Sequence, residues 1–143
     1  MREVYRSTSP EQTEALAERL AARLQSGDVL AFFGPMGMGK TCFTRGLCRG
    51  LGYTGDVNSP TFALVNVYEG GRLPMYHFDM YRITGWEDLY SSGYFDYLEK
   101  EGILVIEWSE NIENALPNRF ISVTIEKAEE TTRVVTVDWG KSN

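Results

Sequence analysis

The chain has 143 residues, of which 43% are hydrophobic and 13% aromatic, enough for one globular domain with a substantial core. Acidic residues outnumber basic ones by 20 to 14, and the net charge of −6 opposes broad contact with a nucleic-acid backbone. No apolar run approaches the roughly 18 residues of a membrane span, and the first residues show no apolar signal region, so we expect a cytoplasmic protein.

The first predicted elements are a short extended segment around Val4 and an amphipathic helix. Ser9 is the expected N-cap of this helix and Pro10 its first residue, a position that proline favours. Leucines then recur every four positions as far as Leu24, which places them on one helix face. Gly27 is the expected end of the helix.

A buried strand, a second helix and a hairpin follow. Residues 28–33 form a short, almost continuous apolar run, typical of a strand covered on both faces. Helical spacing resumes at Lys40, and residues 52–61 are rich in the residues that form loops. Two glycines separate the strand patterns of residues 62–69 and 72–82, which indicates a hairpin.

The second half of the chain completes an α/β pattern. Two short helices, interrupted by Gly93, are predicted within residues 84–102. The remaining elements are, in order, a buried strand (103–108), a short helix (109–117) and two alternating strands (120–126 and 133–139). We therefore predict a single-domain P-loop NTPase-like fold over residues 1–143, with a mixed central sheet flanked by helices.

The segment "GPMGMGKT" (34–41) matches the phosphate-binding pattern G-x-x-x-x-G-K-[ST], between a predicted strand and a predicted helix. Its glycines let the backbone approach phosphates, and N–H groups from about Gly37 to Cys42 would point at them. Lys40 would neutralise the β and γ phosphates, and the hydroxyl of Thr41 would bind Mg²⁺. This segment predicts a nucleotide site.

Two acids lie at the ends of predicted strands, where a P-loop protein needs a carboxylate for its magnesium ion. Glu107 follows four aliphatic residues, so we assign it to Mg²⁺. Asp79 is then the candidate for positioning the attacking water or reporting the nucleotide state. Thr61, after the stiff Pro60 in the long loop, would reach Mg²⁺ or the γ-phosphate as a switch-loop threonine does; the alternative is an ordinary turn threonine.

What the sequence lacks narrows the choice of function. It has no N-K-x-D guanine reader and no D-x-x-G after the phosphate loop, which disfavours a GTPase, and no arginine-bearing lid of the kind that kinases use. Trp108 replaces a second acid after Glu107, so hydrolysis by the chain alone is expected to be slow. Cys42 and Cys48 are interpreted as reduced thiols, and the single histidine, His77, excludes a zinc cage built from histidines.

The blocks "GPMGMGKT", "GDVNSPTF", "YHFDMYR" and "VIEWSE", in this order, closely resemble the bacterial TsaE (YjeE) family. That family is the small ATPase required for threonylcarbamoyladenosine formation on tRNA, and the likeness spans residues 9–137. It implies binding of ATP and Mg²⁺, and hydrolysis that depends on the TsaB–TsaD complex. It also implies that tRNA is reached only through that complex, which agrees with the acidic net charge.

The resemblance also implies roles for single residues. It assigns phosphate contacts to Gly37, Met38, Gly39, Lys40, Thr41 and Cys42, magnesium to Thr41 and Glu107, catalysis to Lys40, Asp79, Glu107 and Thr61, and adenine-side contacts to Ser9 and Arg133. The chain departs from the family at three positions of the loop: Pro35 stands for an acid, Met38 for Ala, and Cys42 for Thr or Ser. The last change affects only a side-chain contact, because the backbone N–H remains.

The leading hypothesis is therefore a partner-activated, Mg²⁺-dependent ATPase that acts in tRNA modification. One alternative is a nucleotide-dependent binding module, in which ATP only orders residues 52–61 and turnover is incidental. Another is a P-loop kinase that transfers phosphate to a small metabolite.

Overall fold

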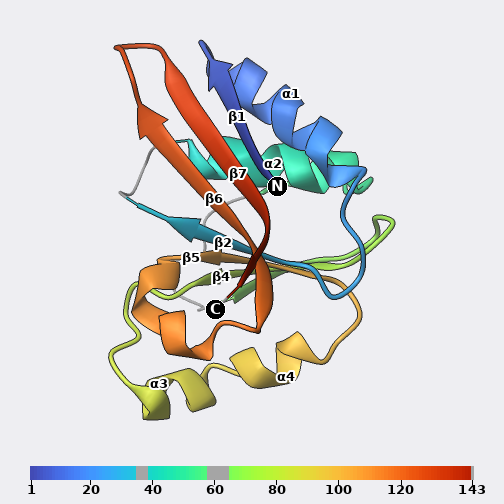
Figure 1. Cartoon of the computed structure of the whole chain (residues 1–143). Coiled ribbons are helices and arrows are strands. Elements are labelled where there is room, and N and C mark those ends of the chain that lie inside the picture. The colour runs from blue at the N-terminus through green and yellow to red at the C-terminus, as the bar shows by residue number, and fades with distance from the viewer. Residues whose placement is uncertain (35–38, 58–64, 143) are drawn as a thin grey trace.

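The computed structural model describes residues 1–34, 39–57 and 65–142, and a seven-stranded sheet forms its centre (Figure 1). The strands are β1 (Arg2–Ser7), β2 (Val29–Phe33), β3 (Val65–Tyr68), β4 (Met75–Asp79), β5 (Ile103–Glu107), β6 (Arg119–Lys127) and β7 (Arg133–Ser142). They lie in the order β1-β7-β6-β2-β5-β4-β3. The inner strands β6, β2, β5 and β4 are parallel, whereas β1, β7 and β3 pair antiparallel with their neighbours. The mixed sheet of the predicted α/β fold is thereby confirmed.

Helices cover both faces of this sheet. The α-helices are α1 (Pro10–Ala21), α2 (Lys40–Gly50), α3 (Trp86–Ser91) and α4 (Tyr94–Leu98), and a 3₁₀ helix, η1, spans Ser109–Ala115. In Figure 1, α1 and α2 lie on one side of the sheet and α3, α4 and η1 on the other. No helix of the described residues is long and apolar enough to cross a membrane.

Both faces of strand β2 are covered, which explains why its sequence is apolar throughout. Leu30 and Phe32 pack into the core beneath α1 and α2, whereas Val29 and Ala31 pack into the second core beneath α3, α4 and η1. Successive side chains of a strand point to opposite faces, so a strand covered on both sides needs apolar residues at every position.

Helix α1 is shorter than predicted. Ser9 caps its first turn with a side-chain oxygen, as expected, but the helix ends at Ala21 rather than at Gly27. The N–H groups of residues 22–24 bond carbonyls three positions back, which tightens the last turn into a 3₁₀-like end. Leu24 nevertheless remains buried, so its helical spacing reflects its place in the core rather than its secondary structure.

The contact between α1 and α2 depends on glycine. A Cβ atom at Gly46 would overlap the carbonyl group of Glu14 and lie 2.8 Å from the Cβ of Ala17. A Cβ atom at Gly50 would lie 2.5 Å from the Cβ of Ala21. The two backbones therefore approach closely along this face, which fixes the position of α2 and of the phosphate-loop residues at its start.

Candidate nucleotide site

The described ends of the predicted phosphate loop adopt conformations that require glycine. Gly34 follows β2 with φ 103°, and Gly39 precedes α2 with φ 97°, both in the left-handed region that residues with a side chain rarely adopt. Gly37, Met38 and Thr61 lie outside the described residues, so their predicted roles stay predictions. The glycine spacing of the motif thus has a backbone reason at both ends.

Lys40 begins α2 and is almost completely buried, with 2% of its surface exposed. Its Nζ donates to the carbonyl oxygen of Gly34 at 3.1 Å and lies 5.8 Å from the centre of the Trp108 ring. Among the described residues no carboxylate forms an ion pair with it. A buried ammonium group is unfavourable without an opposite charge, and a phosphate oxygen would provide one.

Asp79 and Glu107 end the neighbouring parallel strands β4 and β5 and pair directly in register. Burial, and then the negative charge of Glu107, raise the pKa of Asp79 above its usual value. The N–H of Tyr81 donates to Oδ1 of Asp79 at 2.9 Å and acts in the opposite direction, as does the positive charge of Lys40. The structure therefore brings the two predicted acids and the predicted phosphate-binding lysine into one electrostatic environment.

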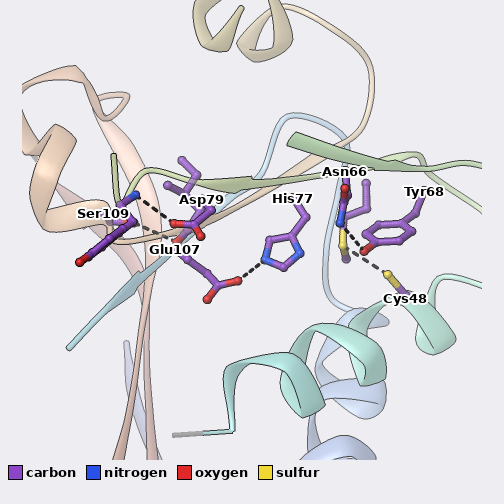
Figure 2. A network of polar contacts seen from close by, with 10 residues as sticks. Cys48, Asn66, Tyr68, His77, Asp79, Glu107 and Ser109 are labelled. Atoms are coloured by element: carbon purple, nitrogen blue, oxygen red, sulfur yellow. Dashed lines mark hydrogen bonds and ion pairs between the residues drawn. The ribbon is translucent and has the colours of Figure 1, made fainter. Parts of the chain in front are cut away.

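His77 is a member of this group that the sequence analysis missed. Its Nε2 lies 2.6 Å from Oε2 of Glu107, and both residues are buried, with exposed fractions of 0% and 7% (Figure 2). Sequence analysis used this histidine only to exclude a zinc cage. Its spacing from Asp79, two positions along one strand, places the two side chains on the same sheet face and was the available signal.

Trp108, directly after Glu107, has an unusual backbone conformation. Its φ of 60° lies in the left-handed region, the only such value for a non-glycine residue in the described parts of the chain. The ring packs 5.0 Å from that of Tyr81 and faces the ammonium group of Lys40. Strained conformations of this kind cluster at functional sites, because surrounding contacts must hold them.

A pocket of about 550 Å³ brings together residues from distant parts of the sequence. Ser9, Gly39, Cys42 and Arg133, all predicted nucleotide contacts, line it together with Thr8, Pro10, Thr13, Glu130 and Thr131. Nη1 of Arg133 donates to carbonyl oxygens of the turn between β6 and β7, which holds the guanidinium group at the pocket. Because Gly39 also precedes Lys40, the pocket adjoins the segment predicted to bind phosphate.

The oxygen donors near Lys40 fit a magnesium ion carried by a nucleotide. Thr41 lies in the first turn of α2, and Asp79 and Glu107 are paired in register at the ends of β4 and β5. Mg²⁺ in such sites takes one or two carboxylates together with phosphate oxygens and water. Within the described residues, no group of three or more acidic, histidine or cysteine side chains is placed to hold a metal without further ligands.

Comparisons with known proteins identify relatives of this chain. A family model described as "Threonylcarbamoyl adenosine biosynthesis protein TsaE" matches residues 7–135. A relative from Bacillus subtilis, named tRNA threonylcarbamoyladenosine biosynthesis protein TsaE, is 41% identical over 92% of this chain and 82% of its own length. A relative of the same name from Treponema pallidum is 35% identical over 92% of this chain and 96% of its own.

The fold agrees as well. A crystal structure of Bacillus subtilis YdiB superimposes with a TM-score of 0.83 at 34% identity, covering 99% of this chain and 87% of the other. The family match spans most of the chain, from the segment before α1 to the first residues of β7, and confirms the resemblance based on the four sequence blocks. The chain therefore belongs to the TsaE family.

Proposed function

We propose that the chain is a Mg²⁺-dependent ATPase that acts, together with the TsaB–TsaD complex, in the formation of threonylcarbamoyladenosine on tRNA. The names of its relatives support the pathway. The observation that carries the ATPase part is the buried Lys40 at the start of α2, whose charge acts on Asp79, the residue paired in register with Glu107.

Each residue has a distinct task in this proposal. Lys40 and the N–H groups at the start of α2 bind phosphate oxygens, aided by the positive end of the helix dipole. Thr41 and Glu107 hold Mg²⁺, which when bound neutralises charge on the phosphates. Asp79 orients the attacking water, and its raised pKa makes it a better proton acceptor than an ordinary aspartate.

The pocket next to Gly39 is the proposed site of the adenine end. Ser9 and Arg133 line it from distant parts of the sequence, and Cys42 lines it from the first turn of α2. A nucleotide placed here has its base against these residues and its phosphates at the start of α2. This arrangement uses one continuous surface, which supports nucleotide binding over a phosphate site alone.

The residue that follows Glu107 is the reason to expect that ATP hydrolysis depends on a partner. Trp108, not a second carboxylate, comes after Glu107, and its ring faces Lys40. A charge-stabilising group supplied by a partner accelerates phosphoryl transfer by about 10³–10⁵-fold in arginine-finger systems. We therefore expect slow turnover by the free chain and faster turnover in the complex.

Phosphate release from Mg-ATP, measured for the chain alone and with TsaB–TsaD added, tests the proposal. Stimulation by the partners is the expected result, and equal, negligible rates in both conditions contradict it. If Asp79→Ala or Glu107→Ala still binds ATP and the partners but fails to support repeated tRNA modification, the result would favour the ATPase. Normal modification by both variants would instead favour a nucleotide-dependent binding module, and ADP release without free phosphate would indicate a kinase.

A further inference from the structure

His77 is completely buried in β4, yet it is polar and contacts a carboxylate that the proposed function assigns to Mg²⁺. It is the single histidine of the chain. In Figure 2 the side chain of Glu107 extends toward the imidazole ring, with Asp79 on its other side. A buried polar group with so specific a partner needs an explanation beyond filling the core.

The contacts of the two ring nitrogens indicate where the proton lies. Nε2 faces Oε2 of Glu107, whereas Nδ1 is buried and has no hydrogen-bond partner among the described residues. A proton on Nδ1 would be a buried donor without an acceptor, which is more costly than an unused lone pair. The arrangement therefore favours a ring whose Nε2–H donates to the carboxylate of Glu107.

Strand register explains how His77 reaches Glu107 without competing with Asp79. His77 pairs with Val105 across β4 and β5, and Asp79 pairs with Glu107. The imidazole therefore approaches the carboxylate diagonally, from two positions back along the strand. The imidazole contacts Oε2 of Glu107, so Oε1 is the carboxylate oxygen that the ring does not contact.

We propose that His77 is a positioning residue that fixes the Glu107 carboxylate so that a single oxygen, Oε1, is presented to the metal. This inference rests on the proposed function, because it takes Glu107 as a magnesium ligand. Loss of a residue that orients a metal-binding carboxylate typically lowers metal affinity or activity by about 10–100-fold. His77 does not touch the pocket near Ser9 and Arg133, so binding of the metal-free nucleotide should not depend on it.

The first test compares nucleotide affinity with and without Mg²⁺ for three variants. His77→Phe fills the space but removes the donor, His77→Gln keeps an N–H near the position of Nε2, and Met75→Leu is a control in the same buried strand face. For ADP, we expect His77→Phe to lose about 10–100-fold in affinity only when Mg²⁺ is present, His77→Gln to recover most of the loss, and Met75→Leu to match the native chain.

Equal affinity of His77→Phe and the native chain in Mg²⁺ would overturn the proposal. An equal loss of ADP affinity with and without the metal would also overturn it. So would a His77→Gln variant that thermal unfolding shows to be folded but that does not recover ADP affinity in Mg²⁺. If the native chain itself binds no Mg-ADP, the proposed function fails first, and that result is separate from any difference among the variants.

The second test needs no variant to fold and no metal. With ¹⁵N-labelled histidine, the native chain gives one pair of imidazole signals, since it has one histidine. We expect a protonated Nε2 in the metal-free protein, because this nitrogen faces Oε2 of Glu107. A bare Nε2, with the proton on Nδ1 alone, would overturn the assignment of the donor.

Discussion

Replacing Gly46 with alanine tests whether close packing of α1 and α2 holds the phosphate-binding helix in place. Alanine favours a helix interior over glycine by about 0.8–1.0 kcal/mol, so propensity alone predicts a more stable protein. Steric contact opposes this gain, because the new Cβ would overlap the carbonyl group of Glu14 and lie 2.8 Å from the Cβ of Ala17. The two effects have opposite signs, so their sizes decide the result.

The steric effect should dominate. The nearest atoms include a backbone carbonyl of α1, which cannot turn away as the end of a flexible side chain can. Adding a methyl group to such a packed contact costs about 1–3 kcal/mol, and occasionally more. After subtraction of the propensity gain of about 1 kcal/mol, we expect a net loss of about 0–2 kcal/mol in the free energy of unfolding. The loss should be accompanied by weaker ATP binding, since Lys40 begins the displaced helix.

Urea denaturation gives the required free energies, because a domain of this size usually unfolds in a two-state transition. The double variant Ala17→Gly/Gly46→Ala provides the control. It removes one of the clashing atoms, so its loss in free energy of unfolding should be smaller than the sum of the losses of the two single variants. The difference, which measures the coupling between the two positions, should be at least about 0.5 kcal/mol. An increase of about 1 kcal/mol for Gly46→Ala alone, with no coupling to Ala17, would refute close packing as the determinant.

Three further predictions concern the site itself. A raised pKa means that the folded chain holds the proton of Asp79 more tightly than the unfolded chain does, so this residue costs stability as pH rises above its usual pKa. In urea denaturation, the stability advantage of Asp79→Asn over the native chain should therefore be larger at about pH 7 than at about pH 4, and a constant difference would contradict the assigned cause. Iodoacetamide should modify Cys42, and ATP should slow that reaction; Cys48 should stay unmodified, because burial raises its pKa to about 12. Mass spectrometry of the labelled peptides checks this, and equal labelling of both thiols would count against it. Lys40→Met should weaken ATP binding strongly. The free protein should be at least as stable in thermal unfolding, because the variant no longer buries an ammonium group. A large drop in both ATP affinity and thermal stability would indicate that the lysine has only a structural role.

Local signals in the sequence were sufficient for much of the fold. The cap at Ser9, the break at Gly93 and the doubly covered strand β2 each depend on a few adjacent residues, and all three are confirmed. The predicted end of α1 was wrong. Leu24 is buried, so the four-residue spacing of the leucines continues past Ala21, where the α-helix ends. Periodicity reports which face a residue buries, not which conformation it has.

The site was predictable only where its chemistry is continuous in the sequence. Lys40 was found through its motif, whereas His77 was missed because its partner is thirty positions later in another strand. The strand order that joins them depends on which long-range pairs form, and no local pattern encodes that choice. The resemblance to a family supplied Ser9 and Arg133, which isolated patterns would not have linked.

The pocket beside Gly39 joins segments that lie far apart in the sequence. Ser9 lies between the first strand and the first helix, and Arg133 opens the last strand, which pairs with the first. The pocket can exist only after β1 and β7 have paired, so a growing chain on the ribosome cannot form it before Arg133 has been added. ATP bound there would join both ends of the polypeptide and raise the free energy needed to detach the edge strand β1. The ligand would thus stabilise chains in which β1 and β7 are paired over chains in which they are not.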